Sequence, residues 1–394
     1  MKRRNFIKSS VVASTSLMMP AFLKSVTPNH MSSRSGKILV VIQLSGGNDG
    51  LNTIIPFEND IYYNMRPTVA IPKTEVLGIS DELGFHPSLA PLRDLYNNGE
   101  LSIINSVGYP NPDRSHFRSM DIWQTASASN EYLSTGWLGR YLDSECEGYP
   151  VYHALEVDEG LSLALKGAHR SGFAMDNPNR IKQAANYHYL KRARQQTQAS
   201  EENISYLYKT LTDTQESADY LFEQSKVHKS KITYPNTKLA KDLKQIAELI
   251  TADTATQIYY VSLGGFDTHA AQKGKQQRLL KQYAEAVKAF TDDLKSNDLF
   301  DDAVIMTFSE FGRRVKQNAG GGTDHGTANN VFMMGGKLKK AGFYNAAPNL
   351  SNLQNDDLIY EIDFRQIYVD LLGNWLEADV DKVLKGQFKG LKLV

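Results

Sequence analysis

Short apolar runs that end in glycine-bearing turns recur along this chain and predict the strands of a buried sheet. The first run covers residues 37–44 and is followed by the turn 45–50. Similar runs cover residues 101–107, 257–263, 303–308 and 331–334. A strand that is buried on both faces reads as a continuous apolar run, which is typical of a central parallel strand.

Helical patterns separate these runs. The clearest lies at residues 275–294, where Leu279, Leu280, Tyr283, Val287 and Phe290 fall at helical spacing. Residues 89–96 and 364–376 are two further helix-like stretches. Strands that alternate with helices predict an α/β fold with a largely parallel sheet. In such sheets ligands bind beyond the carboxyl ends of the strands.

Residues from about 178 to 252 have a different composition. They are polar, rich in Gln, Lys, Glu, Ala and Tyr, and nearly free of glycine. Their leucine, isoleucine and tyrosine positions suggest amphipathic helices. We interpret this segment as a helical insertion packed on the α/β core, and the alternative is a separate helical domain.

The N-terminal 30 residues have the pattern of an export signal. Arg3 and Arg4 precede Phe6, Ile7 and Lys8, and a modest apolar run follows at 11–23. This run is too short and too rich in Ser and Thr for a stable membrane span. The paired arginines resemble the twin-arginine signal, which predicts passage through the twin-arginine translocase to the periplasm or cell envelope. An ordinary secretory signal and an uncleaved anchor are the alternatives.

Charge and cysteine content narrow the class of protein. The chain has 44 basic and 44 acidic residues, but residues 1–30 hold five basic and no acidic ones. Residues 31–394 therefore contain 39 basic and 44 acidic residues and are mildly acidic. Within them we expect one α/β domain at residues 37–394. Because no long basic run occurs, we expect no nucleic-acid partner. The single Cys146 excludes an intrachain disulfide and a multi-cysteine zinc site.

The candidate chemistry lies in the turns beside the predicted strands. Acidic and histidine residues occupy four glycine-bearing turns: Asp49, Asp267, His269, Glu310, Asp324 and His325. Because side chains at strand ends of one sheet converge on one crevice, these six residues are candidate metal ligands. Mixed Asp, Glu and His sets suit zinc, manganese or similar divalent ions, and six donors are enough for two ions.

Each of these residues also has a structural alternative. Asp49 is placed to cap a helix that starts near Leu51. Glu310 can pair with Arg313 or Arg314. The others can serve as turn, cap or hydrogen-bonded structural residues.

The candidate nucleophile is Ser115. It follows a predicted strand and a proline-rich loop and precedes a helix-like stretch at 117–125. The free N–H groups of a helix N-terminus favour an anionic substrate, and Arg114 and Arg118 could help to hold it. The alternative is that Ser115 only caps the helix, and we interpret His116 as structural rather than as a ligand or base. No Gly-x-Ser-x-Gly elbow, phosphate-binding loop or dinucleotide fingerprint occurs.

Five motifs, in this order, resemble those of a bacterial exported family catalogued as domain of unknown function 1501. The resemblance runs from about residue 37 to residue 376, and members commonly carry a twin-arginine leader. The motifs lie at residues 44–53, 114–117, 264–269, 309–313 and 323–326.

That family resembles a distant branch of the alkaline phosphatase and sulfatase superfamily. The resemblance implies a sandwich with a central mostly parallel sheet, helices on both faces and a metal-dependent esterase site. In the superfamily pattern an Asp follows the first strand, and Asp49 matches it. A hydroxyl nucleophile opens a helix in that pattern, which Ser115 could match. A final histidine precedes a strand, and His325 matches it. Asp267 and His269 resemble an Asp and His that bind one metal. Glu310 and Phe311 stand where an Asp-His pair is expected.

These observations lead to one main hypothesis and one alternative. The main hypothesis is an exported hydrolase that acts on a phosphate or related anionic ester, either a small molecule or one derived from a glycan or lipid. It would use one or two divalent ions (zinc, manganese, magnesium or calcium), Ser115 as nucleophile, and Arg114 or Arg313 to hold the anion. The alternative is a non-catalytic binding or assembly protein of the cell envelope, in which Phe311 marks an altered site. The cysteine- or serine-containing sulfatase motif does not occur, which disfavours sulfatase chemistry.

Overall fold

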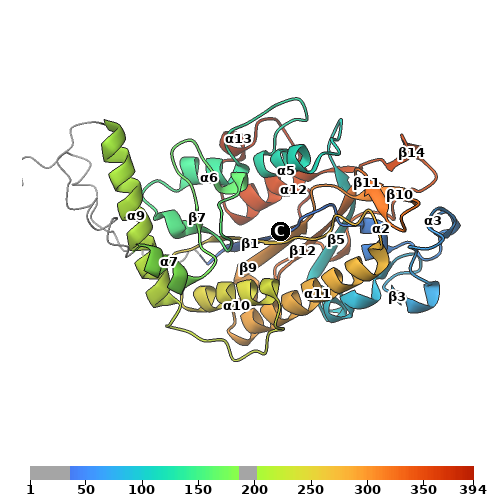
Figure 1. The fold of residues 1–394 in the computed structure, drawn as a ribbon, viewed down its shortest axis with the longest axis horizontal. Helices are drawn as coiled ribbons and strands as arrows, with labels where there is room; N and C mark the ends of the chain where they lie inside the picture. Colours follow the sequence, from blue (N-terminus) through green and yellow to red (C-terminus); the bar gives the residue numbers. More distant parts are fainter. Residues whose placement is uncertain (1–35, 186–201) are drawn as a thin grey trace, which may run out of the picture. The chain divides into compact units, whose positions relative to one another are not determined.

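A nine-stranded sheet forms the centre of the structure (Figure 1). The computed structural model describes residues 36–185 and 202–394. The strand order is β13–β5–β12–β9–β1–β8–β6–β7, and β16 also pairs with β5. The strands are β1 (Ile38–Leu44), β5 (Leu101–Gly108), β6 (Ala154–Glu156), β7 (Phe173–Ala174), β8 (Ile258–Leu263), β9 (Ala303–Phe308), β12 (Asn329–Met334), β13 (Gly342–Phe343) and β16 (Ile362–Asp363).

Almost every strand pair in this sheet is parallel. In β1, Val41 lies beside Tyr260 of β8 on one side and Met306 of β9 on the other, in parallel register. The exception is β12, which runs antiparallel to both of its neighbours, β5 and β9. The predicted α/β fold with a mostly parallel sheet is therefore confirmed, and the five apolar runs of the sequence are its strands β1, β5, β8, β9 and β12.

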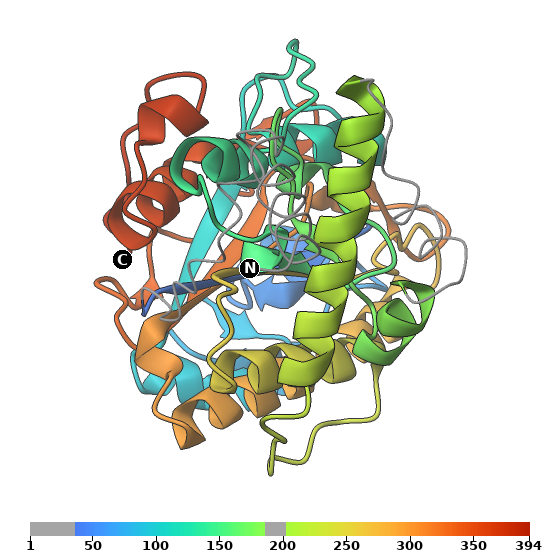
Figure 2. The ribbon, with the colours of Figure 1, turned by 90° about the vertical axis from the view of Figure 1, so that its left-hand side faces the viewer.

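Helices cover both faces of the sheet, which Figures 1 and 2 show from two directions. Alternate residues of β1 face opposite sides: Ile38 and Val40 belong to one apolar core, and Leu39 and Val41 to the other. The first core includes side chains of α10 (Lys238–Thr251) and α11 (Gln272–Ser296). The second includes side chains of α5 (His116–Thr125), α6 (Trp137–Glu145) and α12 (Phe364–Val369).

Two predicted helices differ in detail from the observed ones. The stretch 89–96 contains Pro91, and it forms a 3₁₀ segment (Pro87–Leu92) followed by a short helix, α4 (Arg93–Asn97). Proline removes a helical hydrogen-bond donor and clashes with the preceding turn, so a regular helix starts only after it. The stretch 364–376 begins as α12 and continues as a π-helical turn, Asp370–Trp375.

The predicted helical segment at 178–252 contains three described helices: α7 (Pro178–Ala185), α9 (Glu202–Gln224) and α10. The interpretation of this segment as an insertion stays a prediction. The predicted export signal at 1–30 lies outside the described residues. Among the described helices, none combines the length and apolar character that a membrane crossing requires.

Smaller elements surround the carboxyl edge of the sheet. The helix α2 (Gly50–Thr53) follows the turn after β1, and α3 (Asp60–Met65) lies further along the chain. The strands β10 (Arg313–Gln317) and β11 (Thr323–His325) come between β9 and β12 in the chain and pair with each other in a separate two-stranded sheet. A second small hairpin, β14 (Leu353–Gln354) and β15 (Asp357–Leu358), comes later in the chain.

Candidate metal centre

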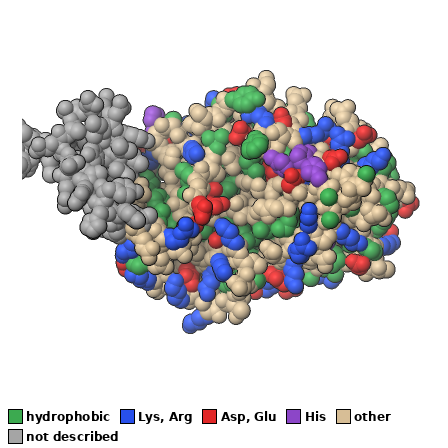
Figure 3. All heavy atoms as spheres, viewed as in Figure 1, with side chains coloured by type: hydrophobic (Ala, Val, Ile, Leu, Met, Phe, Trp, Pro, Cys, Tyr) green, Lys and Arg blue, Asp and Glu red, His purple; other side chains and the backbone are tan. Residues whose placement is uncertain are grey.

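The loops that leave β1, β5, β8 and β9 meet at one edge of the sheet because these strands are parallel. They carry His116 after β5, Asp267 and His269 after β8, and Glu310 after β9. His325 comes before β12 in the chain. Since β12 is antiparallel, the residues that precede it lie at this same edge. Figure 3 shows histidine side chains gathered beside acidic ones on one face of the molecule.

Three histidine side chains direct their Nε2 atoms toward one carboxylate oxygen, Oδ1 of Asp267. The distances to this oxygen are 3.5 Å from His116, 3.0 Å from His269 and 3.3 Å from His325. The Nε2 atoms of His269 and His325 are 2.9 Å apart. The ligand atoms of His116, Asp267 and His325 all lie within 4.8 Å of one another. We call these four residues the His₃Asp cluster.

The other ring nitrogen of each histidine faces an oxygen. The Nδ1 atom of His116 lies 2.8 Å from Oε1 of Glu310, and that of His269 lies 3.0 Å from Oδ1 of Asp324. The Nδ1 atom of His325 lies 2.7 Å from the backbone oxygen of Arg114. A carbonyl or carboxylate oxygen only accepts hydrogen bonds, so the proton of each neutral imidazole belongs on Nδ1. The lone pair of each Nε2 is then directed into the cluster.

This arrangement fits a divalent cation. Nitrogen lone pairs and a carboxylate oxygen face one another without a proton between them, which is unfavourable unless a cation lies there. Nε2 of His116 is buried and has no hydrogen-bond partner among the described residues. Zinc bonds of 2.0–2.1 Å in a tetrahedral site place ligand atoms roughly 3.3 Å apart. The four separations given above, 2.9–3.5 Å, surround this value, and the ligand atoms of His116, Asp267 and His325 spread over at most 4.8 Å.

The electrostatic environment favours the ionised form of Asp267 and the neutral form of His325, which are the forms that bind a metal. Burial opposes ionisation of Asp267, but the hydrogen bond from Arg313 and its positive charge act against it, and the pKa of Asp267 is lowered to about 2. Burial also lowers the pKa of His325 below its usual value, so this imidazole is held neutral. The hydrogen bond to Glu310 raises the pKa of His116, which makes its imidazole a stronger base.

The six predicted ligands occupy three kinds of place. Asp267, His269 and His325 lie in the cluster, and His116 joins them. Glu310 and Asp324 accept hydrogen bonds from the ring nitrogens on the far side of His116 and His269. This is the position of the carboxylates that orient histidine ligands in metal sites.

Asp49 is engaged elsewhere in the structure. Its carboxylate forms an ion pair with Arg66 at 2.6 Å, and both side chains are fully buried. The same carboxylate accepts the backbone N–H of Leu51, so Asp49 is the N-cap of α2, as its structural alternative proposed. It also accepts a short hydrogen bond from the amide of Gln272.

Gln272 connects this buried ion pair to the loops of the cluster. The side chain is fully buried at the start of α11. Its carbonyl oxygen lies 3.3 Å from the hydroxyl of Thr268 and 2.5 Å from that of Thr323. Thr268 separates Asp267 from His269, and Thr323 precedes Asp324. One amide therefore holds both ligand-bearing loops against Asp49.

The predicted catalytic residues also differ in their surroundings. Ser115 is exposed and is the N-cap residue of α5, but its side chain makes no capping hydrogen bond. The guanidinium of Arg114 is partly exposed and pairs with Asp357 through a short contact. Arg313 is fully buried and donates to four backbone carbonyl groups as well as to Asp267.

Phe311 fills the space behind the cluster. Its ring centroid lies 4.8 Å from those of His116 and His325. A Cβ atom on Gly47 would lie 2.2 Å from the Phe311 ring, so only glycine fits at this position, where φ is also positive (+69°). The glycine turn after β1 thus lets the aromatic ring pack against the histidines.

The sequence analysis interpreted His116 as structural, whereas the structure places its Nε2 atom beside Asp267 among the candidate ligands. The signal was present, because His116 follows β5 in the same way that Asp267 and Glu310 follow β8 and β9. The sequence showed no role for Gln272 or Arg66, since both act through buried contacts with residues far away in the chain.

Replacing Glu310 with glutamine is expected to weaken metal binding about 10- to 100-fold, the usual effect of removing a carboxylate that orients a histidine ligand. The amide can still accept from His116, but it carries no charge to strengthen the imidazole. Calorimetric titration with Zn²⁺ measures the change. Glu159→Gln, on an exposed side chain, is the matched control. Unchanged affinity in Glu310→Gln would contradict this role.

The fold and the cluster together define an α/β protein with a candidate metal centre at the carboxyl edge of its sheet. The chain belongs to the family described as "Protein of unknown function (DUF1501)", whose family model matches residues 36–389. This confirms the family resemblance. No curated protein matches the chain.

Several solved structures are similar in fold at low sequence identity. The lipoteichoic acid synthase LtaP from Listeria monocytogenes is 12% identical, with a TM-score of 0.33, over 81% of this chain and 70% of that one. The C-terminal periplasmic domain of EcEptC from Escherichia coli in complex with Zn is 10% identical (TM-score 0.34; 77% and 75% covered). The phosphonate monoester hydrolase SpPMH from Silicibacter pomeroyi is 9% identical (TM-score 0.33; 78% and 69% covered).

Proposed function

We propose that this protein is an exported, metal-dependent hydrolase of phosphate or related anionic esters. The observation that carries the proposal is the His₃Asp cluster, in which each Nδ1 atom faces an oxygen and each Nε2 atom is left for a cation. His116, His269, His325 and Asp267 would hold one divalent ion. A bound ion of this kind supplies Lewis-acid polarisation of the ester and lowers the pKa of a nearby hydroxyl.

The chain's own residues have distinct roles in this proposal. Arg313 keeps Asp267 ionised, while Glu310 and Asp324 fix the rings of His116 and His269. The N-terminus of α5 offers backbone N–H groups to an anionic ester. Arg313 is buried, whereas Arg114 is partly exposed, so of the two arginines Arg114 is the one that a substrate anion would reach, in competition with its partner Asp357.

Ser115 is the proposed nucleophile. It precedes His116 directly, its side chain is exposed, and it makes no capping hydrogen bond. Its oxygen would form a bond to phosphorus as the ester bond breaks and the alcohol leaves with a proton. Water would then release inorganic phosphate and restore the hydroxyl.

Ser115→Ala tests this proposal. Wild-type protein loaded with Zn²⁺, Mn²⁺, Mg²⁺ or Ca²⁺ is assayed with aryl phosphomonoesters, phosphodiesters and sulfate esters. We expect turnover of a phosphate ester, a loss of at least about 10³-fold in Ser115→Ala, and unchanged metal binding. Ser351→Ala, on an exposed serine, is the control. Normal turnover in Ser115→Ala would remove the nucleophile assignment and leave the metal centre standing.

Phe311 favours a second candidate, a non-catalytic binding or assembly protein of the cell envelope. Its ring packs against two of the three histidines, at a position where the superfamily resemblance predicted a ligand. This candidate predicts no turnover of any ester by folded, metal-loaded protein.

Export is proposed from Arg3 and Arg4, which precede the apolar run of the first 30 residues. Replacing both arginines with lysine should leave the chain in the cytoplasmic fraction of its bacterial host. Unchanged export of this variant would exclude the twin-arginine route.

A further inference from the structure

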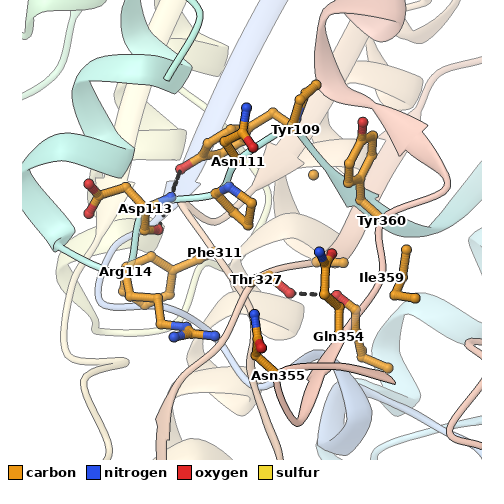
Figure 4. Close-up of a pocket in the computed structure, with 15 residues that line it drawn as sticks. Tyr109, Asn111, Asp113, Arg114, Phe311, Thr327, Gln354, Asn355, Ile359 and Tyr360 are labelled. Carbon is orange, nitrogen blue, oxygen red and sulfur yellow. Dashed lines mark hydrogen bonds between the residues drawn. The ribbon is translucent and has the colours of Figure 1, made fainter. Parts of the chain in front are cut away.

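A cavity of about 480 Å³, whose lining residues Figure 4 shows, lies next to residues that contact the His₃Asp cluster. Phe311 and Arg114 join the two sites. Phe311 lines the cavity and packs against His116 and His325. Arg114 lines the cavity with its side chain and accepts a hydrogen bond from His325 with its backbone oxygen. The volume is within the usual range for small-ligand sites.

Uncharged polar side chains and apolar surfaces make up most of the wall. Figure 4 shows Asn111 on one side of the cavity and Gln354 and Asn355 on the opposite side, with Tyr360 and Ile359 between them. Carboxamides both donate and accept hydrogen bonds, so they suit hydroxyl groups. Aromatic and aliphatic surfaces suit the C–H faces of a sugar ring.

The cavity is poorly suited to a second anion. Among the described residues that line it, Asp113 and Arg114 carry the charges. Arg114 is paired with Asp357, which is itself almost fully buried. Asp113 accepts the backbone N–H of Ser115 at 2.7 Å. The charge that faces the cavity is therefore neutralised or negative, and a neutral ligand is favoured.

A second hollow, of about 360 Å³, lies against the same loop and shares Pro110 and Asn111 with the first. Ala128 and Ser129 line it, and their carbonyl oxygens accept hydrogen bonds from Arg118. The guanidinium of Arg118 stacks on Tyr132 at 3.9 Å, and the Tyr132 residue is 78% exposed. An exposed aromatic ring thus lies near the second hollow.

We infer that these two hollows are neighbouring subsites for a neutral oligosaccharide chain. The inference rests on the proposed function in one respect: an anionic ester group carried by the oligosaccharide would lie at the His₃Asp cluster. One sugar unit would occupy the cavity between Asn111 and Gln354. The next would lie in the second hollow, past the shared residues Pro110 and Asn111 and toward Tyr132.

Binding of uncharged oligosaccharides tests the inference without any need for catalysis. The full chain is titrated calorimetrically, in the presence of EDTA, with cellohexaose, maltohexaose, mannohexaose and chitohexaose. We expect at least one hexaose to bind. Gln354→Trp, which fills the cavity, and Tyr132→Ala, which removes the exposed ring, should each weaken that binding at least 5-fold. Both side chains are exposed, so the fold should tolerate the changes.

Asn352→Ala is the matched control, because Asn352 is an exposed amide of the same segment and does not line the cavity. Absence of binding by all four hexaoses would overturn the inference. So would binding that both variants leave unchanged, or binding to phosphatidylglycerol vesicles without binding to any hexaose. Oligosaccharide binding by a protein that hydrolyses no ester would contradict the proposed function alone.

Discussion

Replacing His325 with alanine is expected to lower the affinity for a divalent metal at least about 100-fold, more than the loss of an orienting carboxylate causes. Nε2 of His325 lies between Asp267 and His269, at 3.3 and 2.9 Å from their ligand atoms. The change removes one donor from the cluster, and the side chain is only partly buried. Calorimetric titration with Zn²⁺, together with metal analysis of the purified protein, measures the loss.

Two further variants make this test specific. His269→Ala should have a similar effect, because it removes the Nε2 atom that lies 3.0 Å from Asp267. His169→Ala, on an exposed histidine outside the cluster, should bind metal as the wild type does. Full-strength binding in both His325→Ala and His269→Ala would show that the cluster is not the metal site.

Replacing Asp49 with alanine should destabilise the fold by about 3–5 kcal/mol, the range found when one partner of a buried ion pair is removed. Both Asp49 and Arg66 are fully buried, so the arginine would keep its charge without a counter-ion. The helix α2 would also lose its N-cap, and Gln272 would lose its carboxylate partner. Urea unfolding at neutral pH, with and without metal, measures the change.

The control is an ion pair in solvent. Glu58 and Lys73 are about half exposed, so Glu58→Ala should cost at most about 1 kcal/mol. Asp49→Asn keeps a side-chain oxygen for the N-cap and removes the charge, so its loss should fall between the two. A cost below about 1 kcal/mol for Asp49→Ala would contradict the role given to the ion pair.

The Asp49 variants also separate support from ligation. If Asp49 only supports the loops, the folded fraction of Asp49→Asn should still bind one metal ion. Its affinity should change only to the extent that Gln272 loses its contacts with Thr268 and Thr323. Complete loss of the metal from a folded Asp49→Asn protein would instead restore the ligand role that the sequence predicted.

The His₃Asp cluster could be predicted only in part. The sequence places Asp267 and His269 after a predicted parallel strand. The strand pattern was therefore enough to predict that they lie close to residues that follow other parallel strands. For His325 the geometry depends on β12 being antiparallel, which brings the residues before it to the same edge. Strand direction is decided by pairing with neighbours, and the apolar run at 331–334 reads the same in both directions.

The division between ligands and supporting carboxylates could not be read from the sequence. Asp267 and Glu310 follow strands and Asp324 lies in the short strand β11, yet of these three only Asp267 directs an oxygen between the three Nε2 atoms. Glu310 meets the opposite side of His116, 194 residues away in the chain, and Asp324 meets the opposite side of His269. Differences of a few ångströms in side-chain placement decide these roles.

By itself, the sequence determined the class of the fold, the five principal strands and the edge where the chemistry lies. These features depend on local patterns: apolar runs form buried strands, glycines end them, and parallel strands share a carboxyl edge. The tertiary structure alone decided that Arg66 pairs with Asp49, that Gln272 connects this ion pair to Thr268 and Thr323, and that His116 lies in the cluster. These contacts join residues distant in the chain, and burial makes an unpaired charge or polar group costly enough to fix each partner.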